Sequence, residues 1–151
     1  MTSDQDTSDI PAAVAWLTGL GMVPFAGLAV LCVTAPEPDP LTAFALLVYG
    51  AVILSFVGGI RWGLAIAPGQ KLTGGALWNT LILSVTPALT AWMALIAPPP
   101  APPFILAAAF ALMLASDWRA ARAGEAPPWY ARLRWPPTVT AIVSLLVVGL
   151  L

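Results

Sequence analysis

Three polar side chains inside long apolar stretches of the chain are the first candidates for chemistry. They are Arg61, Asn79 and Asp117. A charge at the centre of a bilayer costs on the order of 3 kcal/mol, so a buried Arg61 needs a partner. Counting depth along the expected segments places all three in one layer, where we expect an Arg61–Asp117 ion pair. Such a pair could set helix register, bind a ligand or relay a proton. Arg61 could instead reach the lipid head groups, and Asp117 could pair with Arg119 or Arg122.

Other signatures of catalysis are missing from the sequence. It contains no histidine and a single cysteine, Cys32, which we interpret as an apolar filler. It contains no phosphate-binding loop, no GxSxG and no HExxH pattern. We therefore expect no catalytic residues, no metal site and no cofactor, and we expect that the protein is not an enzyme. The net charge of −1 gives no reason to expect nucleic acid as a partner.

The composition is typical of an integral membrane protein. Hydrophobic residues make up 60% of the 151 positions and charged residues only 9%, whereas a soluble domain carries about 25% charged residues. The lipid bilayer is therefore the first expected partner.

Five segments are long and apolar enough to predict membrane-spanning helices, each of which needs about 20 residues. The fold class that we expect is all-α, an integral membrane bundle of five transmembrane helices in one domain at residues 12–151. Residues 1–11 are expected to form a disordered acidic tail. The expected spans are 12–34, 41–67, 74–97, 104–123 and 135–151.

The positions of lysine and arginine predict the orientation of the bundle. With five spans, every basic residue falls on the same side as the N-terminus, while Glu37 and Asp39 lie on the other side. The positive-inside rule then places the N-terminus in the cytoplasm and the C-terminus in the periplasm. We expect a multi-pass protein of the bacterial inner (plasma) membrane. The basic residues are Arg61, Lys71, Arg119, Arg122, Arg132 and Arg134.

Small residues recur at every fourth position of the second expected span, at Ala51, Ser55, Gly59 and Gly63. Such a stripe lets two helix backbones approach closely in lipid. It could pack against a neighbouring helix of the same chain, or it could form a face for self-association.

Prolines inside two other spans, Pro24 and Pro87, predict helix breaks. Breaks of this kind can be purely structural or can line a solute site.

The segment at 128–135 combines aromatic and basic residues beside an expected span. We interpret it as a short amphipathic stretch on the membrane surface, with a docking surface for a protein partner as the alternative. The expected interfacial or docking residues are Arg119, Arg122, Trp129, Tyr130, Arg132 and Arg134.

Three runs occur in the order of a known family. They are YGAVILSFVGGIRWGLA at 49–65, TPALTAWMALI at 86–96 and PPWYARLRWPPT at 127–138. With them, the chain resembles the family of small membrane proteins of unknown function typified by human transmembrane protein 69. The resemblance covers nearly the whole chain from about residue 13. It implies a small multi-span membrane protein and carries no activity with it.

Size, short loops and the missing catalytic set favour a non-enzymatic accessory or assembly factor that acts through helix packing. Its expected partner is a larger membrane complex, or a second copy bound through the small-residue stripe. The alternative is a small transporter or proton/solute conduit that uses the layer of Arg61, Asn79 and Asp117.

Overall fold

The computed structural model describes residues 10–37, 39–67, 72–122, 124 and 128–151. Most of the expected acidic tail and Lys71 lie outside these residues. The described chain forms five helices, of which α1 to α4 are long and apolar enough to cross a membrane. Their bounds are α1 Ala12–Thr34, α2 Pro40–Ala65, α3 Gly74–Ile96, α4 Ala101–Arg122 and α5 Pro128–Gly149.

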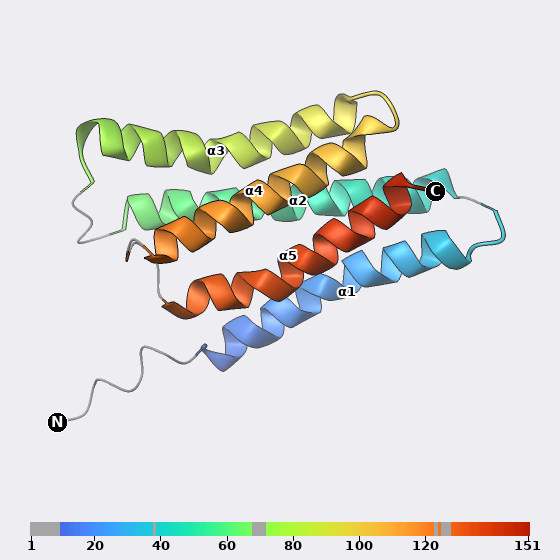
Figure 1. Cartoon of the computed structure of the whole chain (residues 1–151), viewed down its shortest axis with the longest axis horizontal. Helices are drawn as coiled ribbons and strands as arrows, with labels where there is room; N and C mark the ends of the chain where they lie inside the picture. Colours follow the sequence, from blue (N-terminus) through green and yellow to red (C-terminus); the bar gives the residue numbers. More distant parts are fainter. Residues whose placement is uncertain (1–9, 38, 68–71, 123, 125–127) are drawn as a thin grey trace.

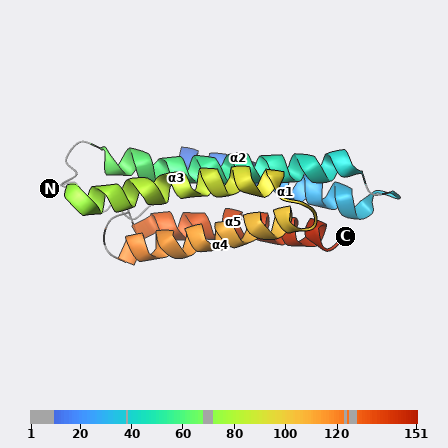
Figure 2. The same ribbon diagram turned by 90° about the horizontal axis from the view of Figure 1, so that it is seen from above.

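The helices run lengthwise beside one another, and consecutive helices alternate in direction (Figure 1). Seen from above, α4 and α5 lie side by side and face α2 and α3 (Figure 2). The remaining helix, α1, packs against α5 and α2. Because the number of helices is odd, the start of α1 and the end of α5 lie at opposite ends of the bundle (Figure 1).

Local signals explain where α2 begins. Asp39 caps the helix: its carboxylate accepts hydrogen bonds from the backbone N–H groups of Leu41, at 3.0 Å, and Thr42, at 3.1 Å. Pro40 occupies the first turn, where its missing N–H costs nothing. The Thr42 hydroxyl, followed by the Leu41 amide, holds the pKa of the exposed Asp39 carboxyl below its usual range.

Two helices begin earlier than the sequence predicts. The first is α4, which starts at Ala101 rather than near Phe104, because the prolines that follow are tolerated in a first turn. The second is α5, which starts at Pro128 rather than near Trp135. The expected surface stretch at 128–135 is thus the first part of α5, and the helix runs through Pro136 and Pro137.

The prolines expected to break helices do not divide them. Pro24 lies inside α1 and Pro87 lies inside α3, and both helices continue past them. Each proline removes one backbone hydrogen bond, and the turns on either side remain helical. Pro87 is buried, and its ring lies against α2 at Gly58. This proline therefore shapes the contact between α2 and α3.

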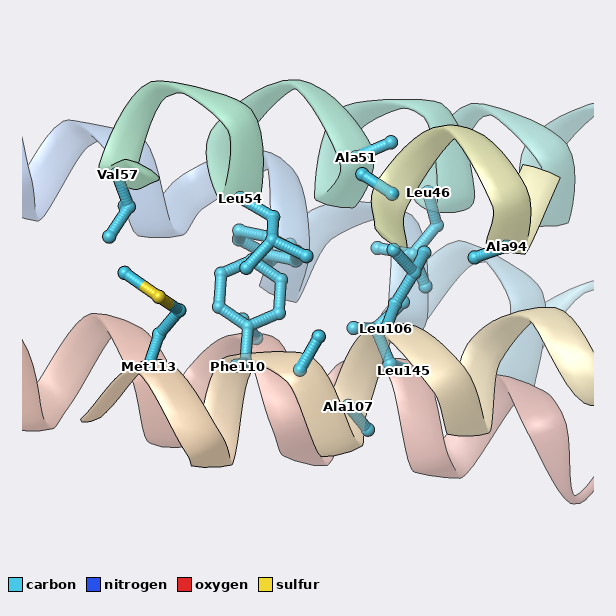
Figure 3. Packing of buried hydrophobic residues seen from close by; sticks show 14 residues of the cluster. Leu46, Ala51, Leu54, Val57, Ala94, Leu106, Ala107, Phe110, Met113 and Leu145 are labelled. Carbon is cyan, nitrogen blue, oxygen red and sulfur yellow. The ribbon is translucent and has the colours of Figure 1, made fainter. Parts of the chain in front are cut away.

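The apolar core contains buried side chains from all five described helices, and most of them belong to α2 and α4. In Figure 3, Leu54 of α2 points toward Phe110 of α4, and Val57 points toward Met113. Leu54 and Phe110 are 0% and 1% exposed. Phe25 of α1 packs edge-on to the Phe110 ring, with ring centroids 5.9 Å apart. Lipid tails are as apolar as these side chains, so close packing rather than escape from water stabilises this core in a membrane.

Gly58 allows the closest helix approach at the α2–α3 contact. A Cβ atom at this position would lie 2.5 Å from the Ser84 carbonyl oxygen. At the neighbouring Gly59, no heavy atom from another segment of the described chain lies within 4 Å of the added Cβ.

We predict opposite effects of the same substitution at these two glycines. Gly58→Ala forces α2 and α3 apart and should destabilise the protein by about 1–3 kcal/mol, as overpacking does. Gly59→Ala should be neutral or stabilising by up to about 1 kcal/mol, because alanine favours helix. Thermal unfolding of the detergent-purified variants measures both. Equal unfolding temperatures for the two variants would contradict the α2–α3 packing described here.

Candidate functional site

Asp117 lies near the end of α4, and its side chain is only 2% exposed. Moving an ionised carboxylate out of water is costly unless it gains charged or hydrogen-bonding partners. A buried Asp117 carboxylate must therefore have such partners. We take Asp117 and the residues around it as the candidate functional site.

Two arginines from different helices bind the carboxylate of Asp117, one at each oxygen. Arg61 of α2 places Nη2 at 3.2 Å and Nε at 3.4 Å from Oδ1. Arg134 of α5 donates from Nε to Oδ2 at 3.2 Å. The two arginine side chains are 14% and 10% exposed, respectively. The cluster therefore ties α2 and α5 to α4 through one carboxylate. We call Arg61, Asp117 and Arg134 the ion triad.

The ion triad contains two positive charges and one negative charge. In surroundings of low dielectric constant, each Asp117–arginine attraction is stronger than it would be in water. The two arginines repel each other, and one unit of positive charge remains uncompensated within the triad. This excess charge makes the site favourable for a negatively charged group.

The structure brings together two of the three residues expected in the polar layer. Arg61 and Asp117 are in contact, whereas Asn79 is exposed on α3 and makes no hydrogen bond to either of them among the described side chains. Depth counting places Asn79 at a height along the helix but not on a helix face. The buried face of α3 contains Ser84, Pro87, Ala91 and Ala94, and Asn79 lies off that face.

Arg134 was expected at the membrane surface, and this expectation is wrong because the residue is buried against Asp117. The expected start of α5 near residue 135 left Arg134 in a loop. A helix that starts at Pro128 puts Arg134 and Asp117 at about equal distances from the α4–α5 loop. Antiparallel neighbouring helices then bring the two residues to the same level. The proline at 128 is the signal that could have revealed this earlier start.

The other expected interfacial residues occupy several environments. Arg119, Arg122 and Arg132 are exposed, and the Arg122 guanidinium lies 5.4 Å from the centre of the Trp118 ring. Asp117 is therefore paired with neither Arg119 nor Arg122. Trp129 and Tyr130 are half-buried, and both contribute to the wall of a cavity beside the ion triad.

The small-residue stripe of α2 divides into two parts. Ala51 is buried, and Ser55 is half-buried and donates a hydrogen bond to the Ala51 carbonyl at 2.8 Å. Gly59 and Gly63 are exposed, and among the residues that the structure describes no other segment comes within 4 Å of their Cβ positions. Within the described chain, α3 approaches α2 at Gly58 instead. The C-terminal part of the stripe, Gly59 and Gly63, thus faces outward.

We predict that Asp117→Asn severely destabilises the fold, because it leaves two buried guanidinium groups without a counter-charge. Breaking a buried ion pair in this way costs about 3–5 kcal/mol. Thermal unfolding measured by size-exclusion chromatography after heating checks the loss. Asp39→Asn is the matched control, since asparagine caps a helix as well as aspartate. An Asp117→Asn variant that unfolds at the wild-type temperature would refute a stabilising triad.

Comparison with known proteins places the chain in a family. Residues 10–150 match the model of the family described as "Protein of unknown function (DUF3429)". Transmembrane protein 69 of Xenopus tropicalis is 34% identical over 137 residues, which are 91% of this chain and 53% of the relative. Transmembrane protein 69 of Mus musculus is 28% identical over 139 residues, which are 92% of this chain and 56% of the relative.

This chain thus spans about half the length of the curated relatives it matches. No solved structure matches it. The family match covers nearly the whole described fold, including all three residues of the ion triad. The chain belongs to the DUF3429 family of membrane proteins, whose function is uncharacterised.

Proposed function

We propose that this protein is a non-enzymatic accessory factor of a larger membrane complex, to which it binds through the outer face of α2. The observation that carries the proposal is the open pair Gly59 and Gly63, which has no heavy atom from another part of the described chain within 4 Å of either Cβ position. A partner transmembrane helix could approach the α2 backbone closely there, since small residues remove the side chains that keep helices apart.

A residue on the same face of α2 supports the same proposal. Val52 continues the outer face of α2 toward its N-terminus and is 58% exposed. A second transmembrane helix would thus meet an apolar side chain along one part of the face and a glycine notch along the other. The expected occupant is a helix of a different membrane protein, and a second copy of this chain is the alternative outcome of the test.

The geometry gives less support to a transporter or proton conduit. Each oxygen of Asp117 binds an arginine, and Asn79 lies outside the site. A conduit through the layer of Arg61, Asn79 and Asp117 would need these groups to face one common path. The ion triad instead resembles a structural connection between helices.

We further propose that α5 spans the membrane with the other four helices and that the protein is a multi-pass protein of a bacterial inner membrane. The supporting feature is charge: Arg61, Arg119, Arg122, Arg132 and Arg134 lie toward one end of the bundle, and Glu37 and Asp39 toward the other. By the positive-inside rule, the arginine-rich end and the N-terminus face the cytoplasm.

This topology predicts opposite behaviour of reporters fused to the two termini in a bacterial host. A green fluorescent protein at the N-terminus should fluoresce, and alkaline phosphatase at the C-terminus should be active. Alkaline phosphatase folds only outside the cytoplasm, where its disulfides can form. An inactive phosphatase fusion of normal abundance would refute a fifth span.

The accessory role predicts a specific loss of the partner. A stoichiometric partner should copurify with the wild-type protein in mild detergent. It should no longer copurify with the Gly59→Leu or the Gly63→Leu variant. The leucine side chains would fill the notch without disturbing the bundle, because no other segment of the described residues lies within 4 Å of either Cβ position. Gly27→Leu in α1 is the matched control, since Gly27 is also exposed and its Cβ position also has no other described segment within 4 Å.

Native mass spectrometry of the purified particle measures the outcome. A wild-type particle that contains only this chain would contradict the accessory role. If the particle contains two copies, the α2 face instead serves self-association. Retention of the partner by both leucine variants would show that the glycine notch is not its site.

A further inference from the structure

A cavity of about 420 Å³ lies between α1, α2 and α5, next to the ion triad. Small-molecule sites in proteins span about 300–1,000 Å³, so the cavity is large enough for a ligand. In Figure 1, α1 and α2 lie closer at their loop than at the end where α1 begins. The cavity occupies this wider end and includes residues of α1 from Val14 to Phe25.

The cavity walls contributed by α1, α2 and α4 are mostly apolar. Phe25, Val57 and Phe110 form its buried part and are 1–2% exposed. Leu17 and Phe56 also line it and are 71% and 67% exposed. These two residues mark a mouth on the side of the bundle between α1 and α2. In a bilayer, such a mouth opens toward lipid, so a molecule dissolved in the membrane could enter.

The wall contributed by α5 is polar in a specific way. Tyr130, Arg134 and Thr138 line the cavity at four-residue spacing, and this places them on one face of the helix. Tyr130 Oη, Arg134 Nη2 and Thr138 Oγ1 are buried without a hydrogen-bond partner among the described residues. The Arg134 side chain is 10% exposed, and Thr138 is 1% exposed. Unsatisfied buried polar groups are costly, and native proteins rarely retain them without a reason.

The chemistry of these three groups defines what they would bind. A guanidinium only donates hydrogen bonds, and the two hydroxyls can donate as well. Arg134 already uses Nε to hold Asp117 Oδ2, so its free Nη2 is held in place. The ion triad also has one uncompensated positive charge. A complementary group must therefore accept hydrogen bonds and carry negative charge.

We propose that this cavity binds an amphiphile with an anionic oxyacid head group and a single apolar chain. The head group accepts hydrogen bonds from Arg134, Tyr130 and Thr138. The apolar chain lies against α1 and α2 and reaches the bilayer at Leu17 and Phe56. The head group could be the carboxylate of a fatty acid or the phosphate of a lysophospholipid, and both provide the same acceptor chemistry.

The test is binding of radiolabelled palmitate to the full chain in a non-ionic detergent, with unlabelled competitors. We expect saturable binding of one palmitate per chain. Methyl palmitate keeps the chain but loses the charge, and it should compete at least about tenfold more weakly. Lysophosphatidic acid distinguishes the sources: stronger competition than palmitate indicates a phosphate head group, and weaker competition indicates a carboxylate.

The double variant Tyr130→Phe/Thr138→Val removes both hydroxyls and leaves the ion triad intact. Palmitate affinity should fall by about tenfold or more, because two hydrogen bonds to the charged head group are lost. Thermal unfolding should not occur at a lower temperature, since two unsatisfied groups are also removed.

Thr140→Val is the matched control on α5. Its hydroxyl donates to the Pro136 carbonyl at 3.0 Å, and the residue is not in the cavity wall. Its palmitate affinity should equal that of the wild-type protein.

Three results would overturn the proposal. The first is no saturable palmitate or lysophosphatidic acid binding by the wild-type chain. The second is equal competition by palmitate and methyl palmitate, which would show that the charge is not recognised. The third is wild-type affinity in the double variant. The competition experiment uses only the wild-type chain, so it decides the question even if the double variant folds poorly.

Discussion

The fold depends on the Asp117 carboxylate, a charge buried where α4 meets α2 and α5. In apolar surroundings, a carboxylate without partners would make this packing unfavourable. Arg61 and Arg134 supply one partner for each oxygen, so the triad forms only when both neighbouring helices are in place. The register of three helices is thereby fixed at one level, a specificity that interchangeable apolar contacts do not provide.

The apolar core and the ion triad stabilise different parts of the bundle. Leu54, Phe110 and their neighbours fill the space between α2, α4 and α5, and Gly58 brings α3 close to α2. Beside Arg134, packing is less complete, and the cavity with its three unpartnered polar atoms lies there. The same two-arginine arrangement that holds Asp117 leaves a positive charge at this cavity. Structural stability and the proposed ligand site therefore share one residue, Arg134.

Hydropathy and charge in the sequence predicted much of this arrangement, because they decide which segments are apolar helices and which polar groups lie at similar depth. They predicted five helices and placed Arg61 near Asp117. They could not assign helix faces, so Asn79 was expected in a layer from which it is absent. Prolines were also interpreted as helix boundaries, so Arg134 was assigned to a surface stretch instead of to α5. The cavity arises from how α1 lies against α2 and α5, and no local pattern encodes that.

A double-mutant cycle on Asp117 and Arg134 directly measures whether these two side chains stabilise each other. The unfolding free energies of Asp117→Asn, Arg134→Gln and the double variant are compared with that of the wild-type chain in the same detergent. We expect the double variant to be more stable than the sum of the two losses implies, with a coupling of about 1–3 kcal/mol, as for residues in one buried network. Additive losses, with a coupling near zero, would show that the two side chains do not stabilise each other and that the ion triad does not fix the register of α4 and α5.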